Sequence, residues 1–389
     1  VVLIGTLVKE LKLLPTIIEQ YTKERAIVPV PKDKKFVNEK DKVWLEDDSS
    51  RIQIKPGPYN AETPASWSDL DFDIHKYSHG SVMGVKGIEF EGVVYVEEFC
   101  VAGAPPQPDG PSLPNSEDPI SADKGRYVVI MSGIAGAEPL QLQMMLNYIQ
   151  GHLGSEKEQS EVISQIVRVI VAGNSFPEQQ KKAGKGILRK QLKDRQHESE
   201  EKREYINLLR DLDIDLAHLA SSIDVDVMPG ESDPSNFTLP HQPLNSCLFP
   251  LSSKFSTFHR VSAPHMCTAD QTVILGTSGE EIKNLQQFIT VEDPTEIVEQ
   301  LIGLRHIAPT APNTLPAYPS EEEDPFVLNV CPHIYFVANQ KSFSSKLFIG
   351  DNGQHTRIVS VPEFVSSNTI AFVNIDTLSC FPMNFSTDF

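Results

Sequence analysis

The stretch "VDVMPGESDPSN", residues 225–236, is an alternating apolar strand that runs into a Pro-Gly turn. Two similar apolar runs precede it, "RYVVIMSG" at 126–133 and "QIVRVIVAGN" at 165–174. Between the three runs, apolar residues recur at helical spacing: Leu142, Met145, Ile149 and Leu153 in the first interval, and Tyr205, Leu209, Leu212, Leu216 and Leu219 in the second. The series predicts a β-α-β-α-β layer structure, with a polar excursion at 181–204 before the second helix.

The C-terminal part is rich in predicted strands. They are "TVILGTSG" (272–279), "HIYFVANQ" (333–340), "KLFIG" (346–350), "RIVSVPEF" (357–364) and "TIAFVNI" (369–375). A helical pattern, "DPTEIVEQLIGL" at 293–304, interrupts them. We expect a second sheet packed on the first, which makes an α/β sandwich over residues 120–389.

The N-terminal hundred residues have a different character. Short β-branched runs alternate with Gly, Pro and charged turns, in "VVLIGTLV" (1–8), "RIQIK" (51–55), "SVMGVKGIEF" (81–90) and "GVVYVEEFCVAG" (92–103). The last two read as a hairpin that turns near Glu91-Gly92. Four or five such strands favour a Greek-key barrel of the OB type over residues 1–110, with a β-sandwich as the alternative. The fold class is therefore mixed α and β.

A proline-rich segment separates the two parts. Residues 104–119 hold six prolines in "APPQPDGPSLPNSEDP", which excludes a helix or a central strand, and we predict a linker at 111–119. The chain opens on "VVLIGTLV" without a methionine, so we expect that residues precede it in the natural protein and that this opening is no signal peptide.

Composition excludes several classes of function. The net charge of −19 argues against general DNA affinity, which depends on Lys and Arg neutralising phosphates. The five cysteines form no C-x-x-C pair, so neither a disulfide framework nor a structural zinc site is expected. No apolar run approaches the about 18 residues that a membrane helix needs.

Ligand sites in open α/β sheets gather at the carboxyl ends of strands. Here those ends are Ser132-Gly133, Gly173-Asn174, Gly230 to Asp233, and Ala338-Asn339. In order and context they resemble the D-x-H, G-D-x-x-D, G-N-H-D/E and G-H-x-H loops of calcineurin-like metallophosphoesterases. That resemblance implies a calcineurin-like phosphoesterase sandwich, whose chemistry needs two metal ions held by carboxylates and imidazoles.

The ligands of such a site are missing from these loops. The first, "SGIAG", has neither Asp nor His, and the fourth, "ANQKS", has no His. Asn174 stands where the bridging Asp belongs, and Ser232 replaces a histidine. Only Asp233 retains a candidate ligand group, and an acidic pair with Glu231 in a Pro-Gly turn indicates turn chemistry. We therefore predict a phosphoesterase-like domain that has lost its metal site, with no catalytic, metal-binding or cofactor-binding residue.

Other candidates are weaker. The histidines are interpreted as structural and as forming no His-Cys cluster: His241, His259, His265, His306 and His333. "GTSG" at 276–279 lacks the nucleophile elbow, and "GIAGAE" at 133–138 lacks the dinucleotide pattern. The basic run "KKAGKGILRK" at 181–190 is interpreted as a solvated insertion.

An OB-like barrel followed by such a domain resembles the B-subunits of replicative DNA polymerases, and within them the small subunits of DNA polymerase delta. The resemblance runs along nearly the whole chain. It is carried by "WLEDDSSRIQIK" (44–55), "VDVMPGESDPSNFTLPHQPLNSCLFP" (225–250), "LRHIAPTAPNTLPAYP" (304–319) and "DPFVLNVCPHIYFVANQKSF" (324–343). "ANQ" departs from the family's more usual Gly-Asn.

The resemblance implies a nuclear, non-catalytic scaffold in DNA replication and repair synthesis. It would bind the cysteine-rich C-terminal domain of the catalytic subunit and a third subunit that reaches the sliding clamp, with weak or indirect DNA contact and no membrane. Three alternatives remain: a B-subunit of another replicative polymerase, a single-strand DNA-binding OB protein, and an active phosphoesterase with unusual ligands. The acidic residues of the barrel disfavour a strand-binding groove.

Overall fold

The computed structural model describes residues 1–14, 35–38, 41–57, 67, 73–111, 125–176, 192–321 and 323–386, with only the backbone for 192–204. The chain divides into two compact units, each made of three separate stretches of the sequence. One contains residues 1–108, 281–331 and 348–354, and the other contains 109–280, 332–347 and 355–389. The expected linker lies almost wholly outside the described residues.

The first unit contains a closed five-stranded barrel with strand order β1-β2-β3-β5-β4. The strands are β1 (Val2–Glu10), β2 (Lys42–Glu46), β3 (Arg51–Pro56), β4 (Val82–Phe90) and β5 (Val93–Cys100). Alternate residues fill its interior: Leu7, Val43, Leu45, Ile54, Met83, Val85, Val94 and Val96. Closure favours the expected barrel over the sandwich, since a closed barrel leaves no unpaired edge strand.

The hairpin between β4 and β5 turns where the sequence predicts. Glu91 and Gly92 have φ values of +51° and +77°, the left-handed pair that a two-residue hairpin turn requires. Strand β2, "KVWLE", pairs with both β1 and β3 and completes the barrel. It is absent from the four strands read from sequence.

Two helices belong to the same unit as the barrel: α5 (Glu280–Phe288) and α6 (Pro294–Leu304). The first residue of α5, Glu280, is assigned to the other unit. Phe36 stacks on Phe288 at 5.6 Å, and Thr290 N donates to the carbonyl of His75 in the short helix η2 (Ile74–Lys76). These contacts group 281–331 with the barrel, although the sequence assigns them to the second domain. Helix α6 confirms the predicted helix at 293–304, with Asp293 as its N-cap.

The second unit contains two sheets. The six-stranded sheet has the order β16-β15-β6-β7-β8-β9, with β6 to β9 parallel. Its strands are β6 (Tyr127–Met131), β7 (Ile166–Ala172), β8 (Asp224–Met228), β9 (Phe258–Arg260), β15 (Thr369–Asn374) and β16 (Cys380–Asn384). The five-stranded sheet is β10-β11-β12-β14-β13: β10 (His265–Ala269), β11 (Thr272–Thr277), β12 (Ile334–Gln340), β14 (His355–Pro362) and β13 (Ser344–Ile349).

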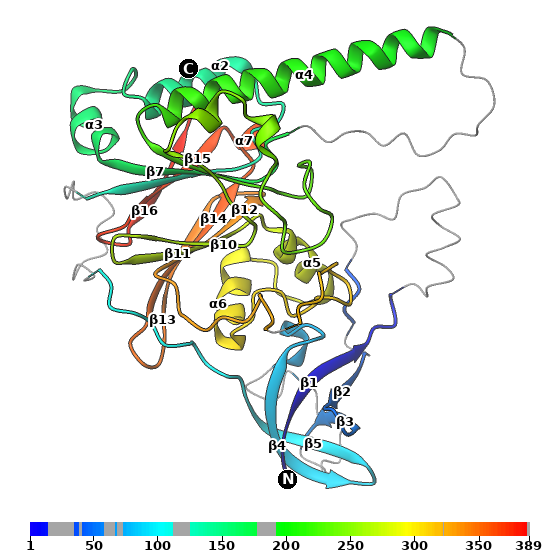
Figure 1. Cartoon of the computed structure of the whole chain (residues 1–389). Helices are drawn as coiled ribbons and strands as arrows, with labels where there is room; N and C mark the ends of the chain where they lie inside the picture. Colours follow the sequence, from blue (N-terminus) through cyan, green and yellow to red (C-terminus); the bar gives the residue numbers. More distant parts are fainter. Residues whose placement is uncertain are drawn as a thin grey trace. The chain divides into compact units, whose positions relative to one another are not determined.

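Helices cover the outer face of the six-stranded sheet, while the five-stranded sheet packs on the other face (Figure 1). The helices of this unit are α2 (Pro139–Ile149), α3 (Glu156–Glu161), α4 (Leu192–Ala220) and α7 (Phe364–Ser367), with short 3-10 turns η3 (Ile163–Gln165), η4 (Ser246–Leu248) and η5 (Ser252–Lys254). In β7, Val169 and Val171 face the helices, and Ile170 and Ala172 face the other sheet. The predicted sandwich is therefore present.

Two predicted helices have different bounds. Helix α2 ends at Ile149, because Gly151 and Gly154 follow with positive φ, so Leu153 lies outside it and is exposed. Helix α4 begins at Leu192 rather than near Tyr205, and its N-terminal turns project beyond the sheet (Figure 1). Most of residues 192–204 are charged or polar residues with good helix propensity, so a helix can form there without the apolar stripe on which the sequence prediction relied.

Candidate functional site at the strand ends

The loops after β6, β7, β8 and β12 meet at one edge of the sandwich. Gly133 N donates to the carbonyl oxygen of Gly173 at 3.1 Å. A Cβ on Gly230 would lie 2.6 Å from Asn174 Oδ1, and one on Gly173 would lie 2.9 Å from the Cα of Gly230. The loops after β7 and β8 therefore pack backbone against backbone, which only glycine at these two positions permits.

Asn174 and Ser232 are hydrogen-bonded to each other. The Oδ1 atom of Asn174 accepts from the backbone N–H of Ser232 at 3.2 Å and from its hydroxyl at 3.1 Å. Asn174 adopts a left-handed backbone, with φ of +53°. Asn174 and Ser232, the two residues that the sequence interpretation compares with a bridging Asp and a His, thus carry a neutral amide and a neutral hydroxyl that are hydrogen-bonded to each other.

Asn339 joins three further segments. Its backbone N–H donates to Ser132 Oγ at 3.0 Å, and that hydroxyl donates to the carbonyl of Pro362 at 3.1 Å. The Nδ2 group of Asn339 donates to the carbonyl oxygens of Ala172 and Ser278, each at 3.0 Å. Asn339 and Ser132 are buried, so these hydrogen bonds replace the ones that their donor groups would make with water in the unfolded chain.

Asp233 is buried and joins the loops after β7 and β8. Its carboxylate accepts from the backbone N–H of Phe176 at 2.9 Å and from that of Gly230 at 2.8 Å. Burial raises its pKa to about 7, against backbone donors that favour the charged form. Its bonds are those of a turn residue, as the sequence predicts, whereas Glu231 beside it is exposed.

The histidines occupy separate places. His241 has Asn236 O 2.7 Å from Nδ1 and Glu280 Oε1 2.7 Å from Nε2, two acceptors that suit a protonated ring. Burial lowers its pKa, but these bonds outweigh burial and raise the pKa overall. His333 Nδ1 accepts from Val273 N. His306 lies 3.1 Å from Asp324, and His259 is exposed.

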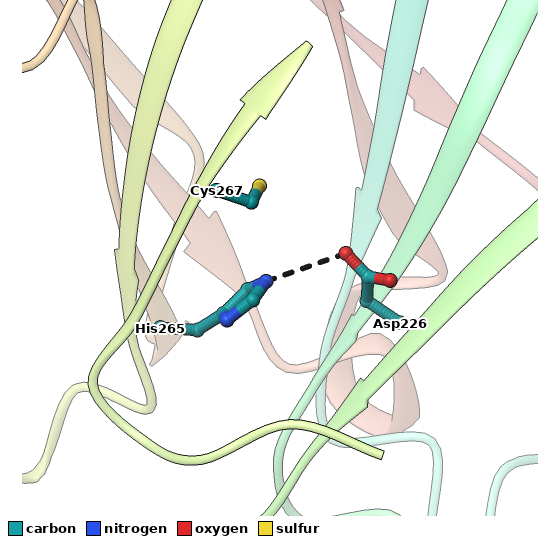
Figure 2. A group of neighbouring side chains, drawn as sticks. All are labelled: Asp226, His265 and Cys267. Carbon is teal, nitrogen blue, oxygen red and sulfur yellow. Dashed lines mark hydrogen bonds and ion pairs between the residues drawn. The ribbon is translucent and has the colours of Figure 1, made fainter. Parts of the chain in front are cut away.

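One constellation was missed from sequence. Asp226 on β8 and His265 and Cys267 on β10 have side chains whose ligand atoms lie within 4.8 Å of one another (Figure 2). The signal was available, since "HMC" at 265–267 places a histidine and a cysteine on one face of a strand. The interpretation that no His-Cys cluster exists is wrong.

Arg168 on β7 completes this cluster. Its Nη1 donates to Asp226 Oδ2 at 2.6 Å, and His265 Nε2 lies 3.3 Å from the same oxygen. Burial acts to raise the pKa of Asp226, but the bonds from His265 and Arg168 outweigh it and hold the pKa below its ordinary value. Burial raises the pKa of the Cys267 thiol to about 11.

Comparison with known proteins identifies the family. The model of the B-subunit family of DNA polymerases alpha and epsilon matches residues 128–345, and that of the DNA polymerase delta subunit OB-fold domain matches residues 1–99. The chain is 37% identical to the DNA polymerase delta small subunit of Arabidopsis thaliana, over 99% of this chain and 82% of the relative. The chain belongs to the DNA polymerase delta small-subunit family.

Two further relatives agree. The DNA polymerase delta small subunit of Oryza sativa subsp. japonica is 38% identical over 100% of this chain and 84% of its own length. The DNA polymerase delta subunit 2 of Drosophila melanogaster is 32% identical over 100% and 83%. The family resemblance and the OB-fold domain predicted from sequence are confirmed. The chain is thus an accessory subunit of the DNA polymerase delta family.

Among solved structures, TT1561 of Thermus thermophilus overlaps 67% of this chain and all of its own, with a TM-score of 0.31 and 12% identity. A likeness of this degree assigns neither a fold family nor an activity to the small-subunit chain. In the part of the chain that the structure describes, no helix combines the length and apolar character needed to cross a membrane.

Proposed function

We propose that this small subunit is a non-catalytic scaffold of DNA polymerase delta. It would hold the cysteine-rich C-terminal domain of the catalytic subunit and a third subunit that reaches the sliding clamp. The observation that carries the proposal is the match to delta small subunits along the whole chain. By the same membership we place it in the nucleus, in DNA replication and repair synthesis.

We further propose that the second unit is a phosphoesterase-like sandwich that has lost its metal site. The support is the internal bonding of the four loops. Asn174 is bonded to Ser232, and Asn339 donates to two carbonyl oxygens. A bridging metal ion needs anionic oxygens or imidazole nitrogens with free lone pairs. Asn174, Ser232 and Asn339 offer neutral groups, and the carboxylate of Asp233 already accepts backbone hydrogen bonds from Phe176 and Gly230.

The charge of the chain supports protein partners over nucleic acid. A net charge of −19 repels phosphates and favours a basic segment of a partner protein, which such a surface would attract at long range. DNA contact would therefore be weak or indirect in the assembled polymerase.

Two measurements on one preparation test this function. The chain co-expressed with the delta catalytic subunit should raise the yield and processivity of the polymerase. The same preparation should show no Mn²⁺-dependent hydrolysis of a phosphodiester such as bis(p-nitrophenyl) phosphate above that of the Asn174→Ala variant. Hydrolysis that depends on Asn174 or Asp233 would refute the lost site, and loss of the polymerase effect would refute the scaffold.

A further inference from the structure

The Asp226, His265 and Cys267 cluster lies away from the loops described above and has no part in the proposed function. Asp226 is on β8 of one sheet, and the other two residues are on β10 of the other sheet. Their side chains point toward one another across the space between the sheets (Figure 2). We propose that these three residues bind one zinc-like divalent cation, which would join the two sheets.

The donor set selects the class of metal. A thiolate and an imidazole are ligands for a borderline-soft ion such as Zn²⁺, whereas Mg²⁺ and Ca²⁺ prefer sites made of oxygen alone. Three protein ligands leave the fourth position of a tetrahedral ion for water.

The spacing of the donors suits a tetrahedral ion. Donor atoms about 2.1 Å from such an ion lie about 3.4 Å apart. His265 Nε2 and Asp226 Oδ2 are separated by 3.3 Å, which is long for a hydrogen bond and close to that ligand spacing. The Cys267 sulfur lies within 4.8 Å of the other two donor atoms, so binding the ion would draw it toward them to reach the ligand spacing.

A second observation concerns the free oxygen of Asp226. Its Oδ1 atom is buried and, among the described residues, has no hydrogen-bond partner. A buried carboxylate oxygen without a partner costs free energy, so it is expected to find one. When Oδ2 binds the ion, Oδ1 is available to Arg168, which now donates to Oδ2 at 2.6 Å.

The charges of the loaded site balance. Arg168 also lies 3.7 Å from Asp224, so the cluster contains one cation and two carboxylates before any metal binds. Adding a divalent ion and ionising the Cys267 thiol brings two positive charges and one negative charge. The sum is zero, which reduces the cost of burying the ion between two sheets.

The test uses Co²⁺, which substitutes for Zn²⁺ and reports thiolate ligation by its absorption. The full chain, stripped of metal by a chelator, should bind one equivalent of Co²⁺ with a sulfur-to-metal charge-transfer band, and Zn²⁺ should displace it. Cys267→Ser should abolish the band and weaken binding by about 10-fold or more. The control, Cys247→Ser, removes an exposed cysteine of the same unit and should change neither.

His265→Gln provides an independent variant should Cys267→Ser fold poorly, and it should weaken Co²⁺ binding similarly while leaving all five cysteines in place. Zn²⁺ should raise the melting temperature of the wild-type chain and not that of either variant. The proposal is refuted if the wild-type chain gives no thiolate band, or if the band survives Cys267→Ser and disappears in Cys247→Ser, which would indicate adventitious binding by a surface thiol.

Discussion

The side-chain oxygen of Asn174 accepts two hydrogen bonds from Ser232, one from its backbone and one from its hydroxyl. This pair joins the loops after β7 and β8. Asp233 adds a bond from Phe176 between the same two loops and a bond from Gly230 within its own loop. The strand ends are thus held by neutral side chains and one buried carboxyl group. The stability of this edge should therefore depend on Asn174 and on the protonation of Asp233.

Asn174→Ala should lower the free energy of unfolding by about 1–3 kcal/mol, because it leaves the backbone N–H of Ser232 without its acceptor, whereas the Ser232 hydroxyl can still donate to the carbonyl of Phe176. Asn174→Asp keeps an acceptor at the same place, so it should cost less than the alanine variant. Urea denaturation of both variants measures the difference. Equal losses in the two variants would show that the side-chain oxygen at position 174 is not what stabilises this edge.

Asp233 makes stability depend on pH. Its folded pKa of about 7 lies above the ordinary value of 3.8, so the folded state holds a proton that the unfolded state releases between these values. The free energy of unfolding should therefore fall as pH rises from about 4 to 7, by up to about 1.4 kcal/mol per pH unit from this group.

The control for this pH dependence is Asp233→Asn, which cannot titrate. Its free energy of unfolding should change less steeply with pH over the same window, although the variant loses about 1–3 kcal/mol because its amide can accept at only one of its two side-chain atoms. If the wild-type and variant slopes are equal, Asp233 is ionised throughout and its pKa is not raised.

Helix α4 offers a matched pair of leucines. Leu219 is fully buried against the six-stranded sheet, whereas Leu208 is 48% exposed. Leu219→Asp should prevent folding or cost more than about 3 kcal/mol, since it buries an unpaired charge, and Leu208→Asp should cost less than about 0.5 kcal/mol. Soluble yield and thermal melting compare them. Similar melting of the two would show that α4 does not pack as described.

Phe237 is a candidate anchor for the proposed subunit contact. Its ring is 81% exposed, yet the loop that carries it is fixed by Asn236, whose side chain bonds to Thr238, Pro240 and Gln242. A rigid loop that presents an aromatic ring loses little conformational entropy on binding. Phe237→Ala should leave stability unchanged within about 0.5 kcal/mol and lower the affinity for the catalytic subunit about 10-fold.

The control is Phe255→Ala in the same unit, whose ring is 38% exposed and more fully packed. It should cost stability without changing the affinity for the catalytic subunit. Unchanged affinity of the Phe237→Ala variant would place the docking surface elsewhere.

The spacing of apolar residues predicted most of the helices and strands, because burying one face of an element imposes that spacing. Strands β6 and β7 are mostly apolar runs, and Leu216 and Leu219 of α4 are buried as their spacing predicts. The first turns of α4 were missed because residues 192–204 show no apolar stripe at helical spacing in the sequence. The grouping of α5 and α6 with the barrel was missed because it depends on long-range contacts such as Phe36 with Phe288.

The candidate sites also depend on contacts between residues that are far apart in the sequence. The four loops could be placed at one edge of the sandwich because the carboxyl ends of its parallel strands converge there, but the bond between Asn174 and Ser232 joins positions 58 residues apart. The cluster of Asp226 with His265 and Cys267 joins two different sheets. Sequence spacing shows only the pair on β10, and the partner on β8 appears only once the sheets are packed.

Binding to the catalytic subunit of DNA polymerase delta is the property on which the proposed scaffold role depends most. Size-exclusion chromatography of the full chain co-expressed with that subunit, with mass measured from light scattering, tests it most directly. We predict one species containing both chains in a one-to-one ratio that persists at moderate salt. Elution of the small subunit apart from the catalytic subunit, while both remain folded, would contradict it.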